Sequence, residues 1–592
     1  MKLAKLIELI NQNKSKIILI SIILFSFHAF FLVFSLGVDF PISDEIDFIP
    51  FVKKFIDGGP WWQDSHFIQH YDHRQVFPPL ILLVSSTFDS GNVVHQMYLG
   101  ISFLVIAIGT LYYLLKKTDN DLVWLIIPIS AVVLNAGQSG CYLWGACATS
   151  LFLVSVSVIL TIFFISRIEK SKLSIIFAVI FSIVASFTNF YGLIIWVVGG
   201  FGLLFLKQRK KQALIIWTIS ATVTYITYFT NYIHGSWKGI QTDTLFTFEG
   251  IDYILQFLSN GLIVHLRQFH SIQITISIVI ILIIIIVPIY LKSRKVEMNK
   301  ITPWLQIGLF GLFGAILTEL GRIGVVGAVA SRYMAIAVFA QISFIVLGSM
   351  IFLYFYKKLK NKRQRMISKI FVFIIISVLI LGISSSYYSG WKIGYDWFYE
   401  NTIKYECLRD DVVQQKCPNI YSGEEQYNNL KLLKELQLSV FSEKGEKKID
   451  SLLDDSSWNG MKLTEKGVGS IKYINNNPFV KAYFIPSESK IFVTREESPI
   501  DIGGFGVFLE KDIDVDSAYV FIDDHVNSKA HYGFLNQNSE IYGEKTKPSY
   551  FAGVGGVIDI SKLSEGCHSV SIRFTHNNEY FIIKTESQIC VN

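Results

Sequence analysis

Two adjacent acidic residues, Asp44 and Glu45, stand in the segment PISDEIDFIP, directly after a long apolar run. An ionised carboxylate at the edge of hydrocarbon is unfavourable unless it is paired or hydrated. A carboxylate held there can act as a general base that takes a proton from an acceptor hydroxyl group. The alternative is structural: Asp44 caps a helix over 45–57, and Glu45 favours the positive end of that helix. The pattern leaves both interpretations open, because a cap also holds the carboxylate in place.

A second polar group follows in the segment HYDHRQVFPPL. The spacing predicts a short helix over 62–75, on which His66, His70 and His73 share one face. Arg74 stays charged and can bind a phosphate through two parallel hydrogen bonds. His73 titrates near neutrality and could donate to a leaving phosphate or orient an acceptor. The alternatives are that Arg74 pairs with a neighbouring acid or a lipid headgroup, and that the histidines are interfacial.

A divalent metal is a further alternative for the same segment. His66 and His70 are four residues apart, and two histidines on one helical face can bind zinc together with an acid. We otherwise expect no cofactor.

The third group lies in TELGRIGVVGAVASRYMAI, where Arg322 and Arg332 stand ten residues apart at the ends of adjoining apolar segments. A long anionic lipid needs cations for its phosphate beside an apolar groove, and the glycines between the arginines allow a close backbone approach. Tyr333 follows Arg332 at the start of an apolar segment. The alternative is that the arginines extend to lipid headgroups and the small residues pack helices.

The composition identifies the elements that must position these residues. The chain has 592 residues, of which 51% are hydrophobic and 17% charged, and its mean hydropathy is +0.43. These values are typical of a helical membrane protein. Eleven apolar segments are candidate spans: 16–37, 93–115, 121–136, 142–166, 173–188, 190–206, 212–229, 271–291, 302–319, 333–355 and 368–387.

The basic residues indicate the sidedness of these segments. Lys and Arg cluster in alternate loops, including 207–211, 292–295 and 357–365. The positive-inside rule then places the N-terminus in the cytoplasm and the loop 38–92 outside the cell membrane. All three polar groups fall on the outer side. Nucleotide substrates and nucleic acid are therefore not expected, and the bilayer is the expected environment.

The chain changes character after the last apolar segment. We expect a membrane domain over 1–390, a mixed extracytoplasmic linker over 391–500 and a β-sandwich-like extracytoplasmic domain over 501–592. The last region alternates polar and apolar residues between Gly, Asn and Asp turns, as β-strands do.

The cysteines divide in the same way. An even number in the outer tail permits bridges between Cys407 and Cys417 and between Cys567 and Cys590, with free thiols as the alternative. Cys141 and Cys147 lie near or in a span, and we expect them to be packing residues.

The architecture of roughly 1–390 resembles the GT-C class of membrane glycosyltransferases, which includes protein O-mannosyltransferases and lipid A aminoarabinose transferases. The features that carry the resemblance are a first anchoring span, an acidic pair early in a long first external loop, and surface helices in that loop. The resemblance implies a sugar donor carried on a polyprenyl phosphate. It also implies that Asp44 is the base or acceptor-orienting residue, that Glu45 assists it, and that arginines in late external loops bind the donor phosphate.

The predicted function is therefore a hexosyl or pentosyl transfer from a polyprenyl-phosphate-linked donor to an extracytoplasmic glycan or lipid of the cell envelope, as in polysaccharide biosynthesis. Asp44 and Glu45 are the expected catalytic residues. His70, His73, Arg74, Arg322, Arg332 and Tyr333 are the expected substrate-binding residues. A transporter or flippase, or a polymerase or ligase, for lipid-linked saccharides is the alternative, although the polar residues gather at one face rather than at mid-membrane.

Overall fold

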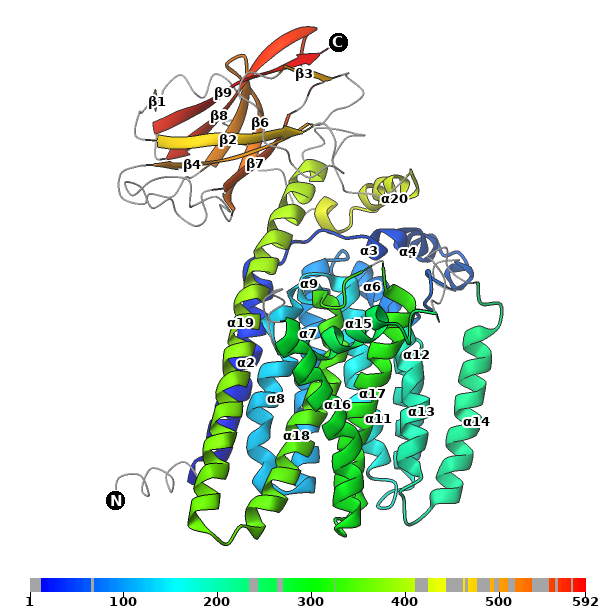
Figure 1. Cartoon of the computed structure of the whole chain (residues 1–592). Coiled ribbons are helices and arrows are strands. Elements are labelled where there is room, and N and C mark those ends of the chain that lie inside the picture. Colours follow the sequence, from blue (N-terminus) through cyan, green and yellow to red (C-terminus); the bar gives the residue numbers. More distant parts are fainter. Residues whose placement is uncertain are drawn as a thin grey trace. The chain divides into compact units, whose positions relative to one another are not determined.

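The structure is a computed structural model of the whole chain (Figure 1). It describes residues 12–64, 69–233, 243–262, 270–324, 326–409, 424–442, 461–463, 467–475, 490–493, 500–508, 517–534, 553–558, 560, 563–576 and 579–591. The chain divides into two compact units. One comprises Met1–Gly37 and Asp44–Gly394, and the other comprises Val38–Ser43 and Tyr395–Asn592.

The first unit is built from apolar helices. Eight helical segments among the described residues are long and apolar enough to cross a membrane, since a helix of about 20 residues spans the roughly 30 Å of hydrocarbon. They are Lys14–Leu36, Val93–Thr118, Asn120–Tyr142, Gly145–Ile165, Lys210–Phe229, His270–Ser293, Met298–Arg322 and Ser331–Lys358. Large apolar side chains such as Leu24, Ile219 and Ile289 are exposed on these helices, as expected for a surface that faces lipid. The chain is thus a multi-pass membrane protein.

This unit consists of helices that follow one another along the chain, and the last of them, α19, continues into the second unit from Tyr395 on. Those before the middle of the unit are α2 (Lys14–Leu36), α3 (Asp44–Asp47), α4 (Ile49–Ile56), η1 (Trp61–Gln63), α6 (Phe77–Phe88), α7 (Val93–Thr118), η2 (Asn120–Leu125), α8 (Ile126–Val133), η3 (Ala136–Gln138), α9 (Ser139–Tyr142), α10 (Gly145–Cys147), η4 (Ala148–Phe152) and α11 (Leu153–Ile165). The remainder are α12 (Leu173–Ser186), η5 (Phe190–Leu193), α13 (Ile194–Leu203), α14 (Lys210–Phe229), α15 (Phe248–Ser259), α16 (His270–Ser293), α17 (Met298–Arg322), η7 (Ser331–Tyr333), α18 (Met334–Lys358) and α19 (Lys362–Arg409).

The count of eleven spans stays a prediction. The predicted segments 173–188 and 190–206 correspond to the shorter apolar helices α12 and η5–α13. The last predicted span, 368–387, lies inside the long helix α19.

Small residues bring α17 and α18 close together. A Cβ atom added at Gly311 would lie 2.4 Å from the backbone nitrogen of Ala340, and one at Gly308 would lie 2.5 Å from Ser343 Oγ. Helices in membranes pack closely where both surfaces lack bulky side chains. Arg322 lies at the C-terminal end of α17, and Arg332 lies in η7, which directly precedes α18.

The first loop differs from its predicted form in two respects. The helix predicted over 45–57 is divided into α3 and α4, with Phe48 between them. The helix predicted over 62–75 is wrong: η1 ends at Gln63, and residues 70–73 form a tight turn. His70 and His73 therefore lie in a turn rather than on one helical face, and His66 lies outside the described residues.

The second unit contains a nine-stranded, mainly antiparallel sheet, preceded by α20 (Glu424–Glu435) and η8 (Ser439–Phe441). Along the main path the strand order is β1-β9-β8-β5-β6-β7-β4-β2, and β3 pairs with β9. The strands are β1 (Lys462–Leu463), β2 (Gly467–Asn475), β3 (Lys490–Val493), β4 (Ile500–Phe508), β5 (Ser517–Ile522), β6 (His525–Phe534), β7 (Gly553–Ile558), β8 (Gly566–His576) and β9 (Glu579–Val591). Its core gathers apolar side chains such as Val520, Ile572 and Phe574.

The strands begin before residue 501, since β1 to β3 and the start of β4 come from the segment expected to be a linker. The sandwich form of the sheet and the division of the chain into three domains stay predictions.

The structure contains two disulfides among the described residues. Cys567 and Cys590 are directly paired across β8 and β9 and form a disulfide, which confirms one predicted bridge. Cys141 and Cys147 also form a disulfide, so the expectation that they only pack was wrong. The short helices α9 and α10 bring their Cα atoms to 5.1 Å, a separation that sequence spacing does not reveal. The bridge between Cys407 and Cys417 lies outside the described residues.

Candidate functional site

The helix α3 presents two carboxylates on one side. Asp44 and Asp47 are three residues apart, and residues at this spacing are neighbours on a helix surface. Asp44 is half-buried, whereas Asp47 is only 6% exposed. Ser43 precedes the helix with φ 47°, so the chain turns sharply before it.

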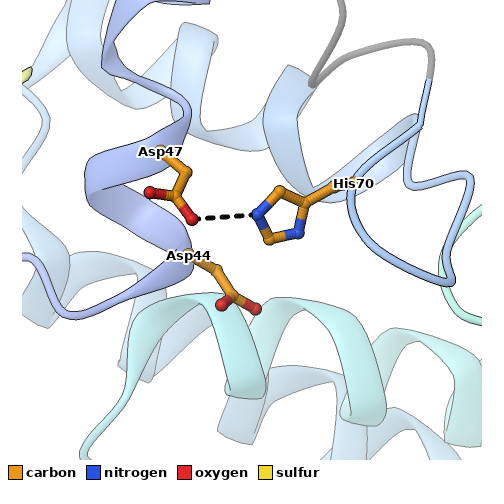
Figure 2. Close-up of side chains that lie close together, drawn as sticks. All are labelled: Asp44, Asp47 and His70. Atoms are coloured by element: carbon orange, nitrogen blue, oxygen red, sulfur yellow. Dashed lines mark hydrogen bonds and ion pairs between the residues drawn. The ribbon is translucent and has the colours of Figure 1, made fainter. Parts of the chain in front are cut away.

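A turn over 70–73 adds a histidine to these acids. His70 and His73 exchange backbone hydrogen bonds of 2.8 and 2.9 Å, and Tyr71 between them has φ 48°. The ring of His70 points at Asp47, and its Nε2 lies 3.1 Å from Asp47 Oδ2 (Figure 2). His70 is 2% exposed, and the Tyr71 hydroxyl donates to the same oxygen at 3.5 Å.

The C-terminal end of α14 and the residues that follow it hold this turn in position. The Tyr232 hydroxyl donates to the backbone oxygen of Asp72 at 3.0 Å, and the backbone nitrogen of Arg74 donates to the Tyr228 hydroxyl at 3.1 Å. The guanidinium of Arg74 donates to the backbone oxygen of Thr230. Arg74 was expected to bind the substrate phosphate. In the structure, its guanidinium donates a hydrogen bond to the segment that follows α14.

Glu45 has a different environment from Asp44. It is 2% exposed, and its Oε1 accepts a hydrogen bond of 2.6 Å from the backbone nitrogen of Ala146. This nitrogen lies in the first turn of the helical segment Gly145–Ile165, where a carboxylate also interacts favourably with the helix dipole. A Cβ atom at Gly145 would lie 2.7 Å from Glu45 Oε1, so glycine permits the contact. Glu45 thus ties α3 to a membrane helix.

Arg322, at the end of α17, reaches the turn from the far part of the chain. Its Nη1 lies 3.6 Å from Asp72 Oδ2. Burial, the charge of Arg322 and His70 lower the pKa of His73 to about 3. His73 therefore stays neutral near pH 7, which corrects the expectation that it titrates near neutrality. Its buried Nδ1 has no hydrogen-bond partner in the described part of the chain.

Arg322 and Arg332 both lie close enough to the same tyrosines to interact with them electrostatically. Both arginines interact electrostatically with Tyr191 and Tyr253. The guanidinium carbon of Arg332 lies 5.4 Å from the centre of the Tyr333 ring. The buried Tyr333 hydroxyl has no hydrogen-bond partner among the described residues. The two predicted arginines and Tyr333 are thus brought together.

The acidic group has two chemical capacities. The half-buried Asp44 carboxylate can accept a proton. In addition, Asp44, Asp47 and His70 each offer one ligand atom, and these atoms all lie within 4.8 Å of one another. Two carboxylate oxygens and one imidazole nitrogen suit a divalent transition metal such as Mn²⁺ or Zn²⁺. This group shares His70 with the predicted pair His66 and His70, and His66 lies outside the described residues.

Two residues of this site were missed in the sequence. Asp47 is part of the motif DEID, whose acids at positions i and i+3 would share a face of a helix. That signal was present, although the adjacent pair Asp44 and Glu45 is more conspicuous. Asp72 carries no local signal, because its partner Arg322 is distant in the sequence.

Comparisons of the chain with protein families, with curated proteins and with solved structures found no match.

Proposed function

We propose that the protein is a membrane glycosyltransferase of the GT-C type. It transfers a sugar from a polyprenyl-phosphate-linked donor to an extracytoplasmic glycan or lipid acceptor of the cell envelope. One observation carries the proposal: Arg322 contacts the turn 70–73, and the same turn binds Asp47 beside Asp44. These contacts support the proposal because they link a cation suited to phosphate and a candidate base to the same turn.

The carboxylate of Asp44 is the proposed base. It accepts the proton of the acceptor hydroxyl while that oxygen forms a bond to the anomeric carbon of the sugar. The bond between the anomeric carbon and the phosphate oxygen breaks, and the polyprenyl phosphate leaves with the electron pair. Asp47 and His70 are positioning residues, because their mutual contact orients the neighbouring acid.

The arginines stabilise the charge of the leaving phosphate. Arg322 ends α17 and Arg332 directly precedes α18, and a cation that is already in place needs little rearrangement during the reaction. The Tyr333 hydroxyl supplies a hydrogen-bond donor beside them. His73 is neutral and can donate from Nδ1, but it cannot supply a charge at pH 7.

A divalent metal is compatible with the same site. Asp44, Asp47 and His70 would hold it, and the metal would orient the donor phosphate. Asp44 would then serve as a ligand, so metal dependence separates the two roles of this residue.

The test compares native membranes that contain wild type, Asp44→Asn or Asp57→Asn at matched expression. Asp57 is an exposed acid of the same loop, paired with Lys53, and is the matched control. We expect Asp44→Asn to reduce transfer about 1000-fold, with loss of one envelope sugar and accumulation of its polyprenyl-linked donor. Asp57→Asn should retain transfer. An unchanged glycan profile for Asp44→Asn, in cells where gene deletion does change it, would refute the proposal.

A further inference from the structure

A second cationic site lies at the end of the helix bundle that carries the basic loops. It combines the last turn of α7 with the turn that follows α11. Lys117 comes from the first segment, and Arg167 and Lys170 come from the second. The three residues belong to no part of the candidate site described above.

Two aromatic rings form the base of this site. Tyr113 and Phe163 pack edge to face with 5.3 Å between ring centres. Lys117 Nζ lies 5.0 Å from the centre of the Tyr113 ring, and the guanidinium carbon of Arg167 lies 5.4 Å from that of Phe163. Arg167 also donates to the Tyr113 hydroxyl at 3.4 Å. Cation–π contacts hold both cations in fixed positions.

The three cations repel one another, and no acidic side chain of the described residues is paired with them. Arg167 and Lys170 both interact electrostatically with Lys117. Within the described part of the chain, no carboxylate oxygen lies within 4.0 Å of any of the three charged groups. The nearby acid Glu169 instead accepts hydrogen bonds from the backbone nitrogens of Lys207 and Gln208. An anion from outside the chain would relieve this repulsion.

Two further acids near α7 are also engaged elsewhere. The side chain of Asp119 accepts a hydrogen bond from the backbone nitrogen of Asp121, and the Asp121 carboxylate lies 3.9 Å from Lys357. Neither neutralises the three cations.

The surface beside the cations is apolar. The ring of Phe164 stacks on Phe177 of α12, with 5.1 Å between ring centres. Ile176, Phe177 and Ile180 are each more than 40% exposed on α12, and Tyr113 is 38% exposed. A cationic site that continues into the exposed apolar face of the helix α12 matches a molecule with a phosphate head and an acyl chain.

We propose that Lys117, Arg167 and Lys170 bind the phosphate headgroup of an anionic phospholipid. The acyl chains of that lipid lie along Tyr113, Phe164 and Phe177. The site is independent of the proposed transferase activity, because it shares no residue with the acidic group or with Arg322 and Arg332.

The test measures binding of phosphatidylglycerol to the purified full-length protein in detergent by native mass spectrometry. The test variant is Lys117→Gln/Arg167→Gln. The matched control is Lys292→Gln/Arg294→Gln, which removes two cations that also contact aromatic rings, those of Phe205 and Tyr290. We expect the test variant to weaken phosphatidylglycerol binding at least tenfold and the control to change it less than twofold. Binding of phosphatidylcholine should be the same in all proteins.

Three outcomes would overturn the proposal. The first is an equal loss in both double variants, which would indicate a general effect of charge. The second is unchanged binding in the test variant. The third is inorganic phosphate that binds to the site as tightly as phosphatidylglycerol does, which would identify a free-phosphate site. If the double variant does not fold, Lys117→Arg/Arg167→Lys keeps the charges and should keep lipid binding, whereas Tyr113→Leu removes the aromatic base and should weaken it.

Discussion

Each of the two units of this protein contains a contact between an aspartate and a histidine. In the membrane unit, His70 Nε2 lies 3.1 Å from Asp47 Oδ2. In the C-terminal unit, His568 Nδ1 lies 2.5 Å from Asp523 Oδ2. The surroundings of the two pairs differ more than their distances do.

The pair in the C-terminal unit is completed by its immediate neighbours. Asp523 accepts hydrogen bonds from the backbone nitrogen and the hydroxyl of Ser569, and His568 Nε2 contacts the backbone oxygen of Ser564. These groups join the β5–β6 turn to β8. The contacts explain a stabilising role without any ligand.

The pair in the membrane unit lies beside further charged groups. Asp44 lies beside Asp47, and Arg322 reaches the same turn through Asp72. Buried charged groups are unfavourable unless they are paired, and they often mark functional sites in membrane proteins. The comparison teaches that the second carboxylate beside the pair, Asp44, rather than the Asp–His contact itself, distinguishes the candidate site from the structural pair.

Within this comparison, the largest difference is expected when the aspartate of each pair is replaced. Asp47→Asn should reduce sugar transfer about 100-fold, because it removes the carboxylate that His70 contacts and with it the contact proposed to position Asp44. Asp523→Asn should leave transfer unchanged. Transfer rates in native membranes at matched expression provide the measurement, and equal losses would remove the distinction between the two pairs.

A second comparison uses two arginines that are each ion-paired with aspartate. Arg322→Gln should reduce kcat/KM about 100-fold, since it removes a cation proposed to stabilise the leaving phosphate. Arg573→Gln, which breaks the 2.9 Å contact with Asp524 in the C-terminal unit, should not reduce it. Steady-state kinetics with the isolated lipid-linked donor test both variants. Full activity of Arg322→Gln would contradict its placement at the phosphate.

The disulfides extend the comparison to stability. Loop-closure entropy predicts a loss of about 2 kcal/mol for Cys141→Ser/Cys147→Ser and about 3 kcal/mol for Cys567→Ser/Cys590→Ser. The first pair encloses Gly145 and Ala146, where Glu45 is bound, so its loss should also lower transfer. Thermal unfolding of the full-length variants and their transfer rates are the measurements. If only Cys567→Ser/Cys590→Ser lowered the transfer rate, the bridge between Cys141 and Cys147 would not be the one that supports the site.

The smallest expected effect is the pH dependence of the structural pair. Burial opposes both charges, but the hydrogen bonds outweigh it, so the pKa of Asp523 is lowered and that of His568 is raised. The stabilisation from His568 is complete below its ordinary pKa of about 6.5 and is lost as the pH rises through the folded-state pKa. The stabilisation from Asp523 is lost as the pH falls through its lowered pKa.

His568→Gln should therefore lower the thermal stability of the full-length protein more at pH 5.5 than at pH 9. Asp523 is 47% exposed, so solvent screening limits the difference to less than about 1 kcal/mol. His525→Gln is the control at the same turn. A larger loss at pH 9 would show that charge does not stabilise the pair.

Local patterns were sufficient for the membrane helices and for many of the strands. Long apolar runs such as 93–115 and 271–291 are helical in the structure, because only internally hydrogen-bonded helices satisfy the backbone in hydrocarbon. Alternation predicted the strands near the C-terminus, and the sequence permitted the pairing of Cys567 with Cys590, which the structure shows. The helix predicted over 62–75 was wrong, because long-range contacts from Tyr228 and Tyr232 stabilise a turn that local spacing does not encode.

By itself, the sequence determined that this is a multi-pass membrane protein, and it identified Asp44, Arg322 and Arg332 as candidates for chemistry. Only the tertiary structure decided which charges meet. It separated Glu45 from the acidic group, added Asp47, joined Asp72 to Arg322, and paired Cys141 with Cys147. The physical reason is that apolar burial depends on local composition, whereas the pairing of charges depends on how distant helices pack.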